Sequence, residues 1–220
     1  MHAGLVTLST FSIALLFSVN VFSQITFQKT YNSGFFNVGY SVQQTNDGGY
    51  AVTGRTSNSG GDGYMVKTDL NGSLQWAQTF GGMRQDNIFS IRQTSGGGYI
   101  LAGSSMSFSV DSLRHFYIAR LNSSGTLLWD KTYGPIAGGQ DIGLHFIRQT
   151  ADGGFISGGN DGGAFGMIYM KTDSSGNMTW GKYIGGVIGS YGLSSIQQSS
   201  DGGYIITGNG NLLFKTNTLG

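Results

Sequence analysis

Short segments of alternating apolar and polar residues recur along the chain, separated by glycine-rich turns. The first full copy has such segments at 40–45, 50–54, 64–68 and 73–80. Strict alternation over several residues is typical of half-buried strands, and Asp47-Gly48 favours the positive φ of a type I′ hairpin turn. The pattern therefore predicts four antiparallel strands in about 50 residues, the size of one propeller blade.

The same pattern returns along the rest of the chain. Its hairpin signals lie at 47–50, 95–99, 152–155 and 201–204, and its tryptophans, Trp76, Trp129 and Trp180, are 53 and 51 residues apart. A unit of this length cannot bury its apolar face alone, so successive copies must stack. We predict a repeat domain over 24–220, divided into repeats at 35–82, 83–135, 136–186 and an incomplete fourth at 187–220.

The predicted fold class is all-β, a β-propeller of four-stranded antiparallel blades. Residues 24–34 match the last strand of the second repeat, with Phe27 in the place of Trp129. They are therefore expected to form a strand that either completes the last blade or precedes the first. Two arrangements stay open: a closed ring of four blades, and an arc of a larger propeller truncated at Gly220.

Composition narrows the possible chemistry. The chain has 39 Gly, one Pro, no Cys and no Glu, and charged residues make up 10% with a net charge of +1. No basic field exists that would hold phosphates, so nucleic-acid binding is not expected. His115 and His145 have no partner at ligand spacing, so no zinc or other metal site is predicted, and no cofactor.

The N-terminal segment predicts export. An apolar run over 5–22 with polar interruptions precedes Ser23, which is typical of a signal peptide over 1–23. A transmembrane anchor is the alternative, and the polar interruptions and missing basic flanks argue against it. The mature chain is expected to be extracellular, at the cell surface or in the periplasm, with no stable membrane insertion.

The recurring string, seen in Gln93-Thr94, Asp47-Gly48-Gly49-Tyr50 and Lys131-Thr132-Tyr133-Gly134, resembles the repeat of secreted β-propeller proteins of Bacteroidota. That resemblance covers 25–220 and implies a propeller, often with export by type IX secretion, but no particular activity. The turns at 69–76 and 173–180 are also similar to the tryptophan-docking motif of quinoprotein dehydrogenases. This second resemblance implies that a ring packs between adjacent blades, and it assigns that role to Trp76, Trp129, Trp180 and Phe27. Sugar stacking by these rings is the alternative.

Candidate binding residues fall in two groups. Arg92 and Arg148 lie on the innermost predicted strands, where they could bind an anion at the channel mouth or bond to carbonyls of a neighbouring blade. The second group lies in the loops between second and third strands, where function is often carried on a rigid scaffold: Asp62, Asp111, His115 and Asp161. The recurring glutamines at 44, 93, 149 and 198 are expected to bond to backbone groups of a hairpin or neighbouring blade, or else to ring a channel.

No catalytic motif is present, and the acids are dispersed among turns, so no enzymatic activity is expected. The sequence favours a secreted, non-catalytic binding or structural module whose ligand is a glycan or a surface protein. Two alternatives stay open: a hydrolase or lyase acting at the channel mouth, and an inert spacer in a larger surface protein. The ligand, the number of blades, the secretion route and the oligomeric state are not determined by the sequence.

Overall fold

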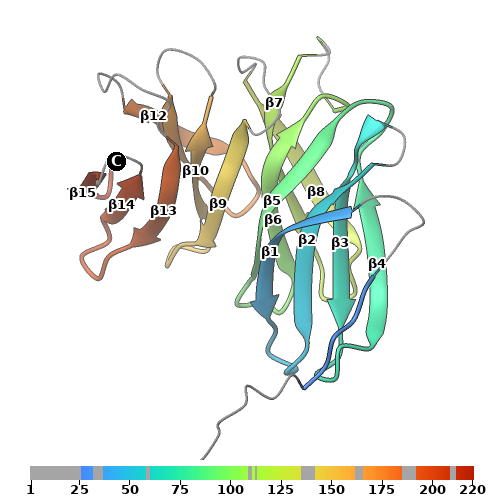
Figure 1. Cartoon of the computed structure of the whole chain (residues 1–220). Coiled ribbons are helices and arrows are strands. Elements are labelled where there is room, and N and C mark those ends of the chain that lie inside the picture. Colours follow the sequence, from blue (N-terminus) through green and yellow to red (C-terminus); the bar gives the residue numbers. More distant parts are fainter. Residues whose placement is uncertain are drawn as a thin grey trace, which may run out of the picture.

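The computed structural model describes residues 26–31, 37–57, 60–108, 111, 113–134, 142–161, 166–184, 192–208 and 212–220. These residues form fifteen strands in four antiparallel sheets, each in sequence order (Figure 1). In the described ranges there is no α-helix, and so none that could cross a membrane. The predicted signal peptide lies outside the described residues.

Sheet 1 contains β1 (Asn37–Gln44), β2 (Tyr50–Thr56), β3 (Gly63–Thr68) and β4 (Leu74–Phe80). Sheet 2 contains β5 (Asp86–Gln93), β6 (Tyr99–Ser105), β7 (His115–Leu121) and β8 (Leu127–Tyr133). Sheet 3 contains β9 (Gly143–Gln149), β10 (Phe155–Asn160), β11 (Met167–Thr172) and β12 (Met178–Ile184). Sheet 4 contains β13 (Leu193–Gln198), β14 (Tyr204–Gly208) and β15 (Leu212–Thr216). The strands predicted from alternation are thus present in all four repeats.

The hairpin turn differs from the prediction. Gly48 N donates to Thr45 O at 2.8 Å and Thr45 N donates to Gly49 O at 2.9 Å, so Asn46 and Asp47 are the central residues of the turn. Gly48 follows them with a φ of 81°. This is a three-residue loop, a type I turn followed by one left-handed residue, and the type I′ prediction was wrong. The same two bonds recur at the other three hairpins, which begin at Thr94, Thr150 and Ser199.

Consecutive sheets stack face to face, and a separate apolar core fills each interface. One core joins Met65 and Phe80 of sheet 1 to Ile88 and Leu101 of sheet 2, and two further cores join sheets 2 and 3 and sheets 3 and 4. Every residue of β6 is buried, whereas β1 and β15 are only partly covered. The two central sheets therefore bury both faces.

The sheets fan out from their first strands. β5 contacts β1, β9 contacts β5, and β13 contacts β9. Figure 1 shows sheets 1 and 4 at opposite ends of the resulting arc. Residues 26–31, for which a strand was predicted, are not assigned to a strand; they lie against sheet 1, where Tyr31 donates to Gly72 O at 2.6 Å.

Each first strand carries a β-bulge at the same place in the repeat. The register shifts between Gly39 and Ser41 in β1, between Ile88 and Ser90 in β5, and between Leu193 and Ser195 in β13. β9 has its shift where Leu144 and Phe146 pair with Gly159 and Gly158. In each strand one bulge residue is skipped in the register with the second strand: Tyr40, Phe89, His145 and Ser194.

A glycine opposite the bulge makes room for it. A Cβ on Gly103 would lie 1.8 Å from Asn87 O, and one on Gly54 would lie 1.8 Å from Val38 O. Gly159 has the same relation to Gly143 O. In sheets 1 to 3, the glycine of the second strand that faces the bulge is therefore required by a close backbone approach, whereas a Cβ on Gly208 of sheet 4 would lie 3.0 Å from Gly192 O.

Candidate functional site

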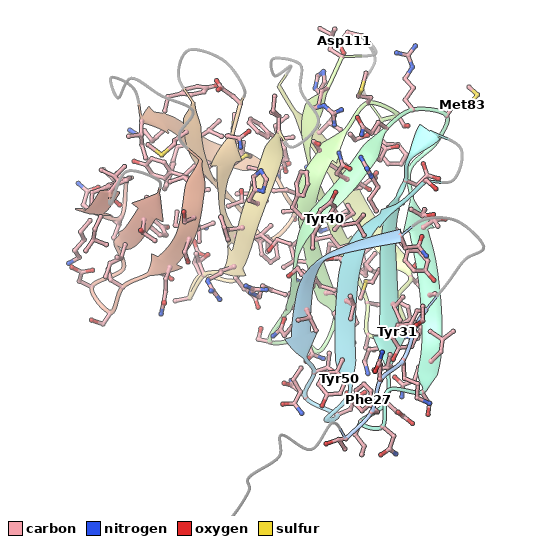
Figure 2. All side chains as sticks on the ribbon, in the orientation of Figure 1. Phe27, Tyr31, Tyr40, Tyr50, Met83 and Asp111 are labelled. Carbon is pink, nitrogen blue, oxygen red and sulfur yellow. The ribbon has the colours of Figure 1, made fainter. Side chains whose placement is uncertain are left out.

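Each docking aromatic packs on the sheet that follows it in the chain. The Trp76 ring lies 5.8 Å from the Tyr99 ring, edge to face, and a Cβ on Gly125 would be 3.0 Å from the indole. The same relation holds for three further triplets: Trp129 with Phe155 and Gly176, Trp180 with Tyr204 and Gly220, and Phe27 with Tyr50 and Gly72. Figure 2 shows Phe27, Tyr31 and Tyr50 together at one end of sheet 1. The three tryptophan rings pack against the inter-sheet cores but are only partly buried, and Trp180 also lines a pocket of about 380 Å³, so packing is present and sugar stacking stays the alternative.

The recurring glutamines join neighbouring hairpins. Gln93 Nε2 donates to Gly97 O of its own turn at 3.1 Å, while its Oε1 accepts from Asn46 N of the preceding sheet at 2.8 Å. Gln149 and Gln198 make the same pair of bonds, each reaching back to the preceding hairpin. The prediction of backbone partners is confirmed, and a ring of glutamines open to a channel is wrong.

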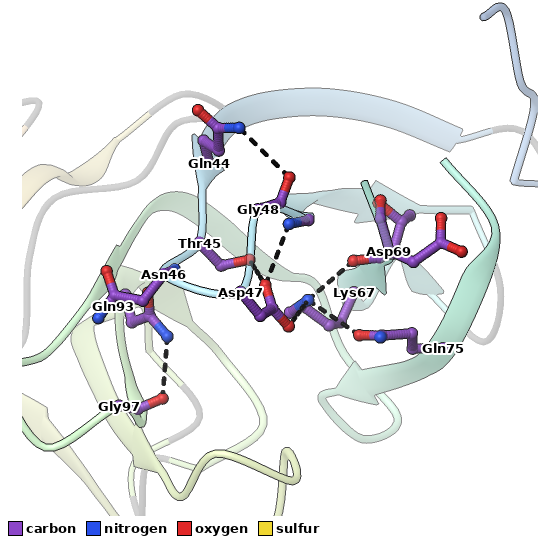
Figure 3. A network of polar contacts seen from close by, with 12 residues as sticks. Gln44, Thr45, Asn46, Asp47, Gly48, Lys67, Asp69, Gln75, Gln93 and Gly97 are labelled. Carbon is purple, nitrogen blue, oxygen red and sulfur yellow. Dashed lines mark hydrogen bonds and ion pairs between the residues drawn. The ribbon is translucent and has the colours of Figure 1, made fainter. Parts of the chain in front are cut away.

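A buried lysine anchors the hairpin aspartate (Figure 3). Lys67 Nζ donates to Asp47 Oδ2 at 2.8 Å, to Thr68 O at 2.7 Å and to Gln75 Oε1 at 2.9 Å. The hydrogen bond from Lys67, with a second from Thr45, lowers the pKa of Asp47 to about 2. Lys171 with Asp152 and Lys215 with Asp201 repeat the pair, so these aspartates have structural roles.

A pocket of about 340 Å³ lies on the first strands of three consecutive sheets. Its lining residues are Tyr40, Ser41, Phe89, Ser90, Arg92, His145 and Phe146. Three of them are the bulge residues of β1, β5 and β9, and a bulge turns the extra side chain away from the regular alternation. The repeated bulge therefore presents one bulge residue from each of sheets 1, 2 and 3 to the same concave space.

The bulge residues form a row of rings. The rings of Tyr40 and Phe89 are 5.1 Å apart and tilted by 56°, and those of Phe89 and His145 stack at 4.5 Å and 16°. Tyr40 is exposed and His145 is half-buried, so the row reaches solvent. This row was not predicted from the sequence, although its members all stand four residues before a recurring glutamine.

Arg92 brings a positive charge to this pocket. Burial lowers the pKa of its guanidinium, and the nearby charge of Arg148 adds to the effect, so the two predicted arginines lie close to one another. Arg92 donates to Ile91 O at 2.5 Å within its own strand. Arg148 Nε donates to Ile196 O of sheet 4 at 3.1 Å, which is the bond to a neighbouring sheet predicted as the alternative. Arg92 therefore lines the pocket, whereas Arg148 bonds to sheet 4 and is not among the lining residues.

The loop residues fall into separate places. Asp111 lies at the loop end of sheet 2, with an oxygen 2.9 Å from His115 Nε2 (Figure 2). Asp161 Oδ1 accepts from Gly166 N at 3.0 Å and shapes its own loop. Asp62 is buried beside Asp86, a residue that the sequence analysis did not single out. None of these residues lines the aromatic pocket.

Catalytic or metal chemistry has few candidates here. Within the described ranges, no group of three or more His, Cys, Asp or Glu side chains could hold a metal ion. The acid pairs that come together, Asp62 with Asp86 and Asp111 with His115, lie outside the described pockets. The aromatic pocket itself holds one histidine and no carboxylate, which suits binding better than acid–base work.

Comparison with known proteins bears on the fold. No protein-family model matches the chain, and no curated protein does. A crystal structure of a protein of unknown function from Bacteroides caccae is similar over 88% of this chain and 67% of that chain, with a TM-score of 0.51 and 11% identity. Sqt1 from Chaetomium thermophilum is similar over 79% of this chain and 41% of that chain, with a TM-score of 0.42 and 13% identity. The chain is an all-β protein of repeated antiparallel sheets, and the first similarity concerns the fold alone.

Proposed function

We propose that the chain is a non-catalytic binding module of the β-propeller type, exported from the cytoplasm, and that its ligand is an acidic glycan held in the aromatic pocket. The observation that carries the proposal is the row of bulge residues beside Arg92. Binding pockets are typically concave, lined by aromatic rings and provided with a few polar groups that set orientation. This pocket has that character.

The propeller assignment is supported by the repetition of the inter-sheet contacts. The docking ring, the glutamine bridge and the face-to-face core recur between successive sheets, as blades around an axis require. The separation of sheets 1 and 4 favours an arc of a larger propeller over a closed ring of four blades. Small-angle X-ray scattering of the purified chain tests this, because a closed ring would give a more compact profile than the arc.

The choice of ligand follows from the side chains. The apolar face of a sugar ring suits a flat aromatic surface such as Tyr40, and a carboxylate or sulfate suits the guanidinium of Arg92. A neutral sugar would leave the guanidinium of Arg92 without an anionic partner in the pocket, which holds no carboxylate, so an acidic glycan is the better fit.

Binding to a glycan array with uronic acid, sulfated and neutral glycans, followed by calorimetry with the best acidic oligosaccharide, tests the proposal. Arg92→Gln should weaken binding about tenfold or more, because a hydrogen bond to a charged group contributes about 1.5–3 kcal/mol. Tyr40→Ala should weaken it too. Lys182→Gln, which removes an exposed cation elsewhere, is the matched control.

Equal binding of the Arg92→Gln variant and the wild type would contradict the anionic site. If the chain captures a protein and no glycan, it is still a binding module, but the proposal of a glycan ligand is wrong. No binding at all, with the fold intact, would favour the spacer. Export is tested separately: the secreted chain should begin at Gln24 by mass spectrometry.

A further inference from the structure

Two buried carboxylates meet where sheets 1 and 2 join, away from the aromatic pocket. Asp62 precedes β3 and Asp86 begins β5, and their exposed fractions are only 7% and 2%. A Cβ built on Gly81 would lie 2.5 Å from Asp62 Oδ1 and 2.7 Å from Asp86 Oδ2. Both oxygens therefore face the same small space, which is open because residue 81 has no side chain.

The two carboxylates differ in the number of hydrogen bonds that they accept. Asp86 Oδ2 accepts from Ser107 Oγ at 2.6 Å and from Gly82 N at 3.2 Å. Its Oδ1 accepts from Ser105 Oγ, from Met106 N at 3.2 Å and from Ser107 N at 3.3 Å. Five hydrogen-bond donors therefore surround the oxygens of Asp86.

Asp62, in contrast, has a buried oxygen that accepts no hydrogen bond. Its Oδ1 has no hydrogen-bond partner, although a buried polar atom without one is costly. Burial and the charge of Asp86 raise the pKa of Asp62. In the described part of the chain, no lysine, arginine or histidine pairs with either carboxylate. Arg114 binds Gln85 and Ser104 nearby and leaves both carboxylates unpaired.

We propose that a calcium ion binds between Asp62 and Asp86 and joins the loops of sheets 1 and 2. Every candidate ligand is an oxygen, which suits calcium and does not suit zinc. Asp62 Oδ1 and Asp86 Oδ2 supply the charge, Ser107 Oγ adds a hydroxyl, and water completes a shell of the usual six to eight oxygens. The ion would satisfy the orphan oxygen and remove the repulsion between the two acids.

This site is independent of the glycan proposal, since it shares no residue with the aromatic pocket. Its consequence would be mechanical: the loop before β3 and the start of the loop after β6 would become rigid together. Those loops belong to the face that the sequence singled out through Asp62.

The test is thermal unfolding of the purified full chain after removal of metal with EDTA, with and without added calcium chloride, together with calorimetry of calcium chloride into the metal-free chain. Calcium at 100 times its Kd should raise the wild-type Tm by about 5 °C or more. Asp62→Asn should abolish this rise. Without calcium, the same variant should be at least as stable as wild type, because it removes a buried, unpaired charge. Asp111→Asn, an exposed acid of a neighbouring loop, should retain the full calcium response.

Two results would overturn the proposal. One is a calcium response that is absent from the wild type or equally large in Asp62→Asn. The other is a shared proton in place of the ion. A raised pKa for Asp62 gives stability that is present at low pH and lost as pH rises through that pKa. If the stability of the wild type falls in this way and calcium does not restore it, the pair holds a proton only.

Discussion

At the scale of single residues, the aromatic rings between sheets contribute packing. Trp129 lies between Phe155 and the turn at Gly176, where its ring is partly buried. Leu128, next to it in β8, is 57% exposed. These neighbouring residues thus differ in burial, since successive side chains of a strand point to opposite faces of the sheet.

Trp129→Ala should therefore destabilise the fold by about 3 kcal/mol, the lower part of the range for loss of a large aromatic side chain from a core, because the ring is only partly buried. Urea unfolding followed by circular dichroism measures this. Leu128→Ala should change the free energy of unfolding by less than about 0.5 kcal/mol. Similar losses for the two variants would mean that the indole does not pack between sheets.

The hairpin aspartates make the stability of the fold depend on pH. At Asp152, burial alone would raise the pKa, but hydrogen bonds from Thr150 and Lys171 outweigh it and bring the pKa to about 2. Asp47 has a similar value, against an ordinary 3.8. A carboxylate whose pKa is lower in the folded than in the unfolded state stabilises the fold. This stabilisation is present above the pKa of the unfolded state and is lost as the pH falls through the pKa of the folded state.

The double variant Asp47→Asn, Asp152→Asn lacks both carboxylates and should be less stable than the wild type above about pH 4. As the pH falls from about 4 to about 2, the wild type should lose this extra stability, so the difference between the two proteins should shrink. The contribution of each pair should stay within about 1 kcal/mol, since the carboxylates are more than half exposed and screened by water. Denaturant midpoints across this pH range measure the difference. Parallel curves for the two proteins would contradict the role assigned to the lysines.

At the scale of the strand, the bulge and its opposing glycine determine where the site lies. Gly103 lets the Asn87 carbonyl approach β6, and the bulge that follows places Phe89, which is itself buried, in the lining of the aromatic pocket. Gly96 lies in the preceding turn, and a Cβ there would meet nothing within 4 Å. The two glycines form a matched pair, because only one of them stands against backbone.

Gly103→Ala should cost about 3 kcal/mol or more, as backbone must move to admit the methyl group, whereas Gly96→Ala should be nearly neutral. Thermal unfolding measures both. If Gly103→Ala still folds, its glycan binding should be weaker than that of Gly96→Ala, because Phe89 would be displaced. Wild-type stability in Gly103→Ala would show that the close approach does not exist.

At the scale of the whole molecule, burial is uneven along the arc. Sheets 2 and 3 are packed on both faces, while sheets 1 and 4 each have one face less covered. Local opening is easiest where the fewest apolar contacts must be broken.

Amide hydrogens of β6 and β10 should consequently exchange more slowly than those of β1 and β15, in hydrogen exchange followed by mass spectrometry. Equal protection of all four sheets would indicate that each end sheet is covered in solution, for example by a second copy of the chain. The comparison should be made at low protein concentration, where such association is weakest.

The sequence by itself determined the strands and their grouping into four repeats, and it offered backbone groups as one of two possibilities for the partners of the glutamines. These features depend on local rules, namely alternation with a period of two, turn residues and repetition, and a repeat shows the same rule several times. The exception among the elements is 26–31, for which a strand was predicted from the match of Phe27 and Tyr31 to Trp129 and Tyr133. Both tyrosines donate to a turn carbonyl of the next sheet, but pairing with a neighbouring strand is not a property of the segment alone.

Only the tertiary structure decided which side chains meet. A bulge breaks the alternation on which the sequence analysis depended, so Tyr40, Phe89 and His145 could not be assigned to a shared pocket from their parity. Asp62 and Asp86 belong to different sheets, and their oxygens converge because the stacking of those sheets places them on either side of Gly81. The physical reason is the same in both cases: local sequence specifies a strand, but distances between strands arise only when their apolar faces pack together.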